Sequence, residues 1–409
     1  TSVLVKNRFG NEALSDISNV GADGNLLSPD DRRRMTGLAN QLWHADASFV
    51  DPAGRYSMLS ARVIPPVDAD TQFADMRAAY DALAAQLNAA RDRLWQIDLW
   101  RKRGLGLLAR DFGPTYVAQD RAARLFLYRG DMAAEWAAYG ASAHDDTQAW
   151  VDGVNAFVGE IHSGARALPK TFQIAGTRPD LWTPEDVVRI RSHGLTRNAA
   201  NEVGRAQIAC ASGLEATRLY RKLEPKWKTK VPEGLDPCDI PDDVLTDYQL
   251  GTGGVKFSGP PALRAMAEVP PEAIGSNNWT VSGKRTDTGR PILSNDPHRE
   301  HGAPSLRYIV HMEAPGFSVI GAGEPALPGV SIGHNGTIAF GLTIFPADQE
   351  DLYVYETKPG DPLAYRYGEG WARMEVVRET IEVRGQAPRE VELHFTRHGP
   401  GLKEQVARK

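Results

Sequence analysis

The sequence predicts an α+β fold, or a layered αββα arrangement, with a helical N-terminal half and a β-rich C-terminal half. Two patterns carry this prediction. Apolar residues recur at helical spacing in the first half, and short alternating or apolar runs between Gly, Pro and Asn-Gly turns fill the second. The chain has 409 residues, 42% of them hydrophobic. It is therefore long enough for a sizeable core and for two or three domains.

The composition of the chain argues against some classes of binding partner. The formal net charge is -5, from 47 Lys and Arg against 52 Asp and Glu, with no basic block. This balance argues against nucleic acid or a membrane surface as the main partner, and no apolar run of about 18 residues predicts a membrane span. The two cysteines, Cys210 and Cys238, are too few for a disulfide framework and form no CxxC zinc pair. The chain starts at Thr1 without a basic-then-apolar leader, so we expect an export signal to be absent or already removed.

The predicted helices occupy the first half of the chain. Residues 73–100 carry apolar residues at helical spacing, residues 133–143 are rich in alanine, and residues 150–158 repeat the helical spacing. At residues 183–186, we expect Thr to be the N-cap residue and Pro to occupy the first helical position, and two acids follow. The Lys-, Pro- and Gly-rich stretch 222–271 indicates a loop or linker.

The predicted strands follow residue 274, apart from one at 56–64 that ends at two prolines. They are short runs of β-forming residues, namely 279–282, 307–312, 318–320, 337–340, 352–355 and 391–395.

Ser276 is the candidate nucleophile. It follows Gly275 at the end of the long predicted loop. A serine needs a base, and if the Gly275–Ser276 bond is cut, the freed α-amine of Ser276 can serve, because its unperturbed pKa of about 7.7 to 8.0 lies near neutrality. Glycine before the serine suits such self-cleavage, because it tolerates strained dihedrals. A serine at a loop-to-strand junction can also be a simple cap or turn residue.

The motif Gly275-Ser276-Asn277-Asn278-Trp279 resembles the processing site of the penicillin acylase group of N-terminal nucleophile hydrolases. The resemblance covers about residues 89–409, and other motifs follow in order: 90–98 for an early helix, 295–298, and the glycine-rich turn 328–336. It implies the layered αββα fold of that group. It also implies that His298, 22 residues after Ser276, holds the α-amine and part of the oxyanion site, and that the backbone N–H of Ile344 donates to the oxyanion.

Four acids fall where, by the same resemblance, related acylases bind one structural Ca2+ between two subunits. Hard oxygen ligands in this number suit calcium better than zinc. The same acids also fit a solvated turn. They are Glu202, Asp348, Glu350 and Asp351.

The first 88 residues carry a different signal. His44 and Asp46, two residues apart on a strand, would point to one face and could both reach one metal, as in a facial iron site. Segments 11–19, 56–59 and 71–80 resemble the 2-oxoglutarate-dependent dioxygenases of the taurine and phenoxyacetate type. This resemblance implies Fe2+ ligands at His44 and Asp46, a 2-oxoglutarate contact at Thr71, and part of a jelly-roll fold.

Both resemblances are incomplete. No later histidine lies in the dioxygenase's distal motif, so residues 1–88 indicate a partial segment rather than a working oxygenase. The acylase's later oxyanion asparagine has no assignable counterpart. We therefore divide the chain into a partial dioxygenase-like segment (1–88), a helical α-subunit-like region (89–222), a linker- or spacer-like loop (223–275) and the N-terminal part of a β-subunit-like region (276–409).

The resemblances imply three alternatives. The first is an amide hydrolase that cleaves an N-acyl amide (a β-lactam, an acyl-homoserine lactone or a lipopeptide) by Ser276, with its own α- and β-like fragments as partners and a periplasmic or extracellular location. The second is an Fe(II)/2-oxoglutarate dioxygenase acting on a taurine- or phenoxyacetate-like substrate in the cytoplasm. The third is an inactive fused or truncated chain.

Overall fold

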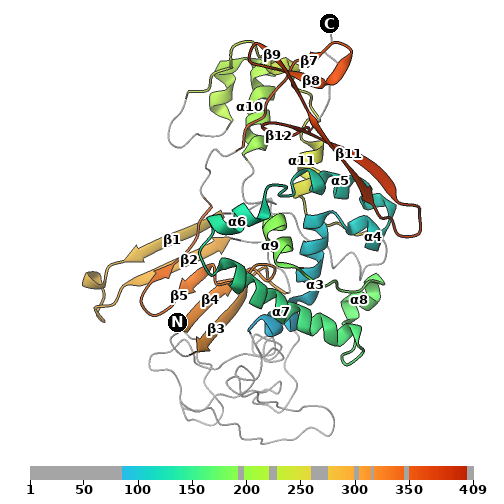
Figure 1. Ribbon diagram of the computed structural model, residues 1–409. Coiled ribbons are helices and arrows are strands. Elements are labelled where there is room, and N and C mark those ends of the chain that lie inside the picture. The colour runs from blue at the N-terminus through green and yellow to red at the C-terminus, as the bar shows by residue number, and fades with distance from the viewer. Residues whose placement is uncertain are drawn as a thin grey trace, which may run out of the picture. The chain divides into compact units, whose positions relative to one another are not determined.

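A computed structural model describes residues 85–191, 198–220, 228–258, 275–298, 304–314, 317–344 and 350–402. All of them belong to one compact unit, Asp75–Lys409. They combine helices with strands, which confirms an α+β fold (Figure 1). The predictions at His44, Asp46, Thr71 and the strand 56–64 lie outside the described residues, as does Asp348.

Apart from the short η4, the helices come before the strands along the described chain, as the sequence predicts. No helix among the described residues is long and apolar enough to cross a membrane. The helices are α3 (Ala85–Leu105), α4 (Leu108–Phe112), η1 (Pro114–Tyr116), α5 (Val117–Leu125), α6 (Met132–Ala138), α7 (Ala143–His162), α8 (Lys170–Ala175), α9 (Pro184–Arg191), α10 (Ala199–Ser212), η2 (Leu214–Leu219), η3 (Pro237–Asp239), α11 (Thr246–Thr252) and η4 (Gly283–Arg285).

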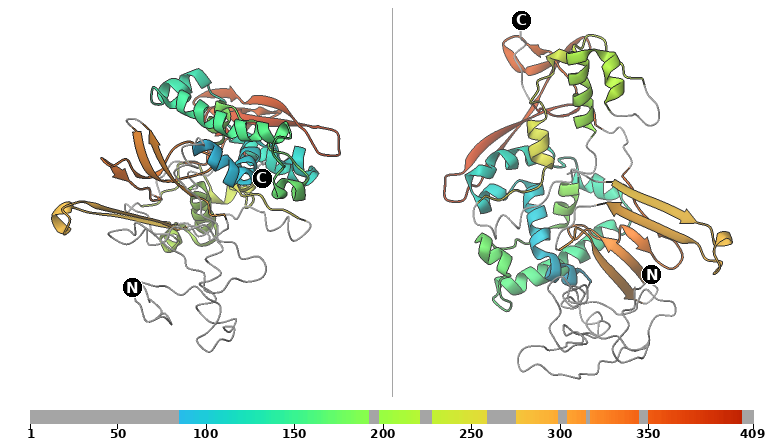
Figure 2. Two further views of the ribbon diagram at one scale, coloured as in Figure 1. Left: turned by 90° about the horizontal axis from the view of Figure 1, so that it is seen from below. Right: turned by 180° about the vertical axis from the view of Figure 1, so that it is seen from behind.

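The strands form antiparallel sheets in which neighbours along the chain pair with one another, in the orders β1-β2, β3-β4-β5-β6, β7-β8-β9 and β10-β11-β12 (Figures 1 and 2). Their bounds are β1 (Gly275–Val281), β2 (Ile292–His298), β3 (Tyr308–Ala314), β4 (Phe317–Gly323), β5 (Ile332–His334), β6 (Ala339–Phe340), β7 (Thr357–Lys358), β8 (Asp361–Tyr367), β9 (Gly370–Arg373), β10 (Glu375–Ile381), β11 (Arg389–Thr396) and β12 (Gly399–Pro400).

The largest core cluster lies among α3, α7 and α9. On α7 the buried residues recur at helical spacing, and Trp150 packs edge-on against Trp182 with ring centroids 5.1 Å apart. The predicted start of α9 is confirmed, because Pro184 opens the helix and the side chain of Asp186 accepts from Thr183 N at 3.0 Å. A second cluster joins Leu99 and Phe257 to Ile381, so helices and later strands share one core.

Beside this core lies a buried ion-pair network. The side chain of Lys102 is fully buried, and its Nζ lies 2.6 Å from Asp98 and 2.5 Å from Asp111. It also donates to the carbonyl of Arg178 at 2.8 Å. Because a buried cation without a partner is costly, these contacts are what allow a lysine at this position.

Three predicted elements differ in the structure. The alanine-rich run 133–143 splits, because α6 ends at Ala138 and α7 begins at Ala143, with Gly140 between them. The stretch 222–271 contains α11, where buried Tyr248 packs with Val203 of α10. Residues 352–355 form no strand; Tyr353 instead stacks on His398 with centroids 4.2 Å apart, so side-chain stacking replaces a backbone ladder.

Candidate active site

Ser276 and Ile344 come together in the structure. Ser276 is the second residue of β1, and Ile344 follows β6, 68 residues later. The backbone N–H of Ile344 donates to the hydroxyl oxygen of Ser276 at 2.9 Å. Ser276 is half-buried and Ile344 is exposed, so this pair of atoms lies at the surface of the described residues.

His298 lies on the neighbouring strand, opposite Gly275 rather than Ser276 in the register of β1 and β2. Its Nε2 is 2.9 Å from a carboxylate oxygen of Asp296, which follows the period-2 rule that places alternate strand residues on one face. A neutral imidazole that donates from Nε2 to this carboxylate leaves Nδ1 as the acceptor. Asn277 Nδ2 lies 3.2 Å from the same Nε2.

The structure gives a reason for glycine at position 275 that differs from the tolerance of strained dihedrals expected from the sequence. Gly275 belongs to β1 and is not among the glycines with positive φ. Instead, a Cβ added at Gly275 would lie 3.1 Å from His298 Nδ1. Close approach of the imidazole, rather than an unusual dihedral angle, favours glycine before the serine.

Among the predicted acids, Glu350 contacts the start of α10 and the side chain of Tyr248 on α11. The Oε2 atom of Glu350 accepts from the hydroxyl of Tyr248 at 2.8 Å and from Ala199 N at 3.1 Å. Glu202 lies on α10, and Asp351 is exposed. Within the described ranges, no three His, Cys, Asp or Glu side chains form a group that could hold a metal ion. The described residues alone therefore do not assemble a calcium site.

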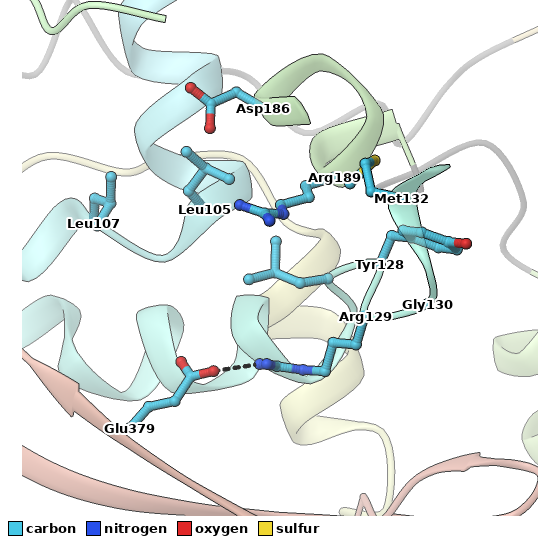
Figure 3. Close-up of a pocket in the computed structure, with 10 residues that line it drawn as sticks. Leu105, Leu107, Tyr128, Arg129, Gly130, Met132, Asp186, Arg189 and Glu379 are labelled. Atoms are coloured by element: carbon cyan, nitrogen blue, oxygen red, sulfur yellow. Dashed lines mark ion pairs between the residues drawn. The ribbon is translucent and has the colours of Figure 1, made fainter. Parts of the chain in front are cut away.

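A cavity of about 510 Å3 lies elsewhere, lined by residues from α3, α9 and β10 among others (Figure 3). Arg129 and Glu379 in its wall form an ion pair at 2.7 Å, and Leu105 and Met132 add apolar surface. None of its lining residues is a predicted site residue. We therefore assign the candidate chemistry to the β1–β2 hairpin and not to this cavity.

Comparisons with known proteins match the chain to two families, the same two that its motifs resemble. Residues 75–409 match the family model described as penicillin amidase. Penicillin acylase 2 proenzyme of Pseudomonas sp. strain SE83 is 32% identical over 316 residues, covering 76% of this chain and 39% of that protein. Acyl-homoserine lactone acylase QuiP of Pseudomonas aeruginosa is 29% identical over 321 residues, covering 76% and 36%. The chain thus spans about two fifths of the length of these relatives.

Residues 14–129 match the model described as taurine catabolism dioxygenase TauD, TfdA family. The alpha-ketoglutarate-dependent 2,4-dichlorophenoxyacetate dioxygenase of Cupriavidus pinatubonensis is 54% identical over 87 residues, covering 21% of this chain and 30% of that protein. Residues 75–129 match both models. In the described part of this overlap, Arg124 donates to Glu379 at 3.0 Å and the hydroxyl of Tyr116 donates to Lys256 O at 2.8 Å. Residues 85–129 therefore fold together with the part that matches penicillin amidase alone.

Proposed function

The chain belongs to the penicillin amidase family, and from that premise we propose that it is an amide hydrolase whose nucleophile is Ser276, exposed by cleavage after Gly275. The observation that carries the proposal is the 2.9 Å hydrogen bond from Ile344 N to Ser276 Oγ. It joins the two residues that the motifs assign to attack and to oxyanion binding, although they are far apart in sequence.

Cleavage begins with attack of Ser276 Oγ on the carbonyl carbon of Gly275. The C–N bond breaks as the acyl group moves to oxygen, and water then hydrolyses the ester. The products are the carboxylate of Gly275 and the free α-amine of Ser276. His298 supports this proposal by lying opposite Gly275, where its imidazole approaches the bond to be cut.

In the catalytic cycle the α-amine of Ser276 takes the proton from its own Oγ, directly or through water, while Oγ attacks the amide carbonyl of the substrate. The carbonyl oxygen becomes an oxyanion on the same carbon that Oγ now bonds, two bonds away from Oγ. Because Ile344 N–H already lies within hydrogen-bond distance of Oγ, the same N–H can donate to that oxygen. The leaving amine takes a proton, and water releases the acyl group as a carboxylic acid.

The substrate class we propose is a small N-acyl amide. The relatives are named as a penicillin acylase and an acyl-homoserine lactone acylase. The compounds in these two names both carry an acyl group on an amide nitrogen. A β-lactam, an acyl-homoserine lactone or a lipopeptide fits this definition. The two fragments produced by cleavage remain partners, which is supported by contacts such as Tyr248 with Glu350, on opposite sides of the cut.

We extend the proposal to the complete fold, a layered αββα unit as in N-terminal nucleophile hydrolases, with a jelly-roll segment before it. Antiparallel sheets and a helical region that shares their core support the first part. The dioxygenase match of residues 14–129 supports the second.

We also propose a structural Ca2+ with Glu202, Asp348, Glu350 and Asp351 as its ligands. The described members of this set are not in a group of three side chains that could hold a metal ion, so the proposal depends on Asp348, and no catalytic step involves the metal. If calcium binds, millimolar Ca2+ raises the Tm and EDTA lowers it. The same result after Asp348→Asn would exclude this ligand set.

A second candidate function rests on the N-terminal match to the dioxygenase family. His44 and Asp46 would ligate Fe2+, and Thr71 would contact 2-oxoglutarate. Oxygen uptake that depends on 2-oxoglutarate and disappears in His44→Ala would support this activity, whereas equal uptake in both proteins would exclude it.

For location we propose the periplasm or the exterior, as for an acylase, over the cytoplasm expected of a dioxygenase. Cys210 and Cys238 support this choice, because they form a disulfide with Cα atoms 5.0 Å apart and disulfides persist in oxidising compartments.

The experiment that tests the acylase proposal compares the protein with Ser276→Ala. Incubation with an N-acyl amide panel should release carboxylic acid from the parent and none from the variant, and only the parent should split before residue 276. Release of acid by the variant at the parent's rate would contradict the proposed nucleophile. An intact parent that hydrolyses no member of the panel would instead support the inactive fused or truncated chain.

A further inference from the structure

The side chain of Asn295 makes three hydrogen bonds around the candidate site. Its Oδ1 accepts from Leu342 N at 2.9 Å, and its Nδ2 donates to Leu342 O at 3.0 Å and to Asn277 O at 3.1 Å. The amide orientation follows from this network, because only the oxygen can accept the N–H and only the nitrogen can donate to the two carbonyls.

These bonds replace a backbone ladder. Residues 341–344 follow β6 and belong to no strand, yet Leu342 has both its N–H and its C=O bound by one side chain, as it would by a neighbouring strand. Asn295 itself lies on β2, paired with Asn278 of β1. The amide therefore connects β1 and β2 to the segment after β6.

The two ends of this connection adjoin the reacting atoms. Asn277 is the next residue after Ser276, and Leu342 lies two residues before Ile344. Asn295 thus fixes the spacing between the strand that carries Oγ and the segment that carries the Ile344 N–H, which meet at 2.9 Å.

Gly341 completes the contact. A Cβ added there would lie 2.6 Å from Asn295 Oδ1 and 2.7 Å from Asn278 Nδ2. Such distances would force the segment away from β1, so this close approach requires glycine.

We propose that Asn295 is a positioning residue that holds the Ile344 N–H on Ser276 Oγ through its bonds to Leu342 and Asn277. This inference rests on the proposed function for its effect on turnover, but the positioning itself can be measured without turnover. Gly341 serves the same positioning, because its lack of a side chain lets the segment 341–344 approach Asn295.

The test follows amide hydrogen exchange of Ile344 in the full chain. In Ser276→Ala this amide has lost its acceptor, which gives the reference rate for a released donor. Asn295→Ala and Gly341→Ala should raise Ile344 exchange toward that rate, with Ser276 intact. Asn335→Ala is the matched control, because Asn335 Oδ1 accepts within its own turn, from Thr337 N and Ile338 N, and it should leave Ile344 exchange unchanged.

Turnover gives the second measurement. Where the parent hydrolyses an N-acyl amide, Asn295→Ala should lower kcat by about 10²-fold, as displacement of a catalytic group by about 1 Å does, with little change in KM. Should Asn295→Ala fail to fold, Asn295→Asp and Gly341→Ala serve instead, since Asp keeps the acceptor for Leu342 N and places an oxygen opposite the two carbonyls.

Ile344 exchange at the parental rate in the folded Asn295 and Gly341 variants would overturn the positioning role, as would an unchanged kcat. A parent without any hydrolysis would contradict the proposed function alone, because the exchange measurement would still decide the role of Asn295.

Discussion

The helical region around α3 and the hairpin β1–β2 are stabilised by different kinds of interaction. Around α3 the buried Lys102 is paired with Asp98 and Asp111, and apolar side chains fill the space between helices. At the hairpin the polar residues are partly exposed, and side-chain hydrogen bonds such as those of Asn295 fix the backbone. Stability and site geometry therefore depend on different residues, and substitutions should separate them.

The largest expected effect falls on stability. Lys102→Met should lower the free energy of unfolding by about 3–5 kcal/mol, because the buried Asp98 and the half-buried Asp111 would lose their shared cation. Urea or guanidinium titration measures it. Lys284→Met, at an exposed lysine of the hairpin, is the control and should change stability by less than about 0.5 kcal/mol. Equal midpoints for the two variants would remove the contrast between the regions.

The next effect falls on the site alone. Ile344→Pro removes the N–H that reaches Ser276 Oγ and should lower turnover of an N-acyl amide by about 10²- to 10³-fold, with little change in Tm. Ile344→Ala keeps the N–H and should stay near the parental rate. If the alanine variant loses as much turnover as the proline variant, the side chain and not the N–H is what matters.

A smaller effect depends on pH. Burial raises the pKa of Asp98 to about 6, against the opposing influence of Lys102. The folded state therefore holds this proton more tightly than the unfolded chain, so the free energy of unfolding should fall as pH rises from about 4 to about 6 and stay level above. Relative to Asp98→Asn, the parent should lose about 1–3 kcal/mol over this interval. A difference that grows with pH would contradict the sign.

The smallest effect concerns Gly275. In Gly275→Ala the new Cβ would lie 3.1 Å from His298 Nδ1, but that imidazole is 48% exposed and can shift. Cleavage before Ser276 should slow by less than about tenfold, since side-chain adjustments of this kind cost about 0.5–1.5 kcal/mol. Gly275→Val should slow it further, and a mass-spectrometric time course measures both. Faster cleavage in the valine variant would mean that the approach of His298 does not limit the reaction.

Much of this arrangement could be predicted from the sequence. Helical spacing predicted α7, the capping pattern at residues 183–186 predicted the start of α9, and the run 391–395 became β11. By resemblance, the ordered motifs assigned the nucleophile to Ser276 and an oxyanion donor to the N–H of Ile344, and the structure brings these two groups to 2.9 Å. Their catalytic roles stay predictions, as do the ligand roles of the four acids.

The other features of the site and the fold depend on contacts between residues far apart in the chain, which no local sequence pattern predicts. Asn295 lay inside a recognised motif, but its partner Leu342 is 47 residues away and is bound through its backbone, which leaves no mark in the side-chain sequence. The disulfide between Cys210 and Cys238 spans 28 residues, and a pair of cysteines alone does not reveal its pairing geometry. The partners of His298 could have been found, because Asp296 precedes it by two residues on one strand.

The mass of the purified full chain tests the central claim most directly. The account predicts two fragments that divide between Gly275 and Ser276, and a single 44.7 kDa chain for Ser276→Ala. An uncleaved 44.7 kDa parent, or a parent and variant cut alike, would contradict it.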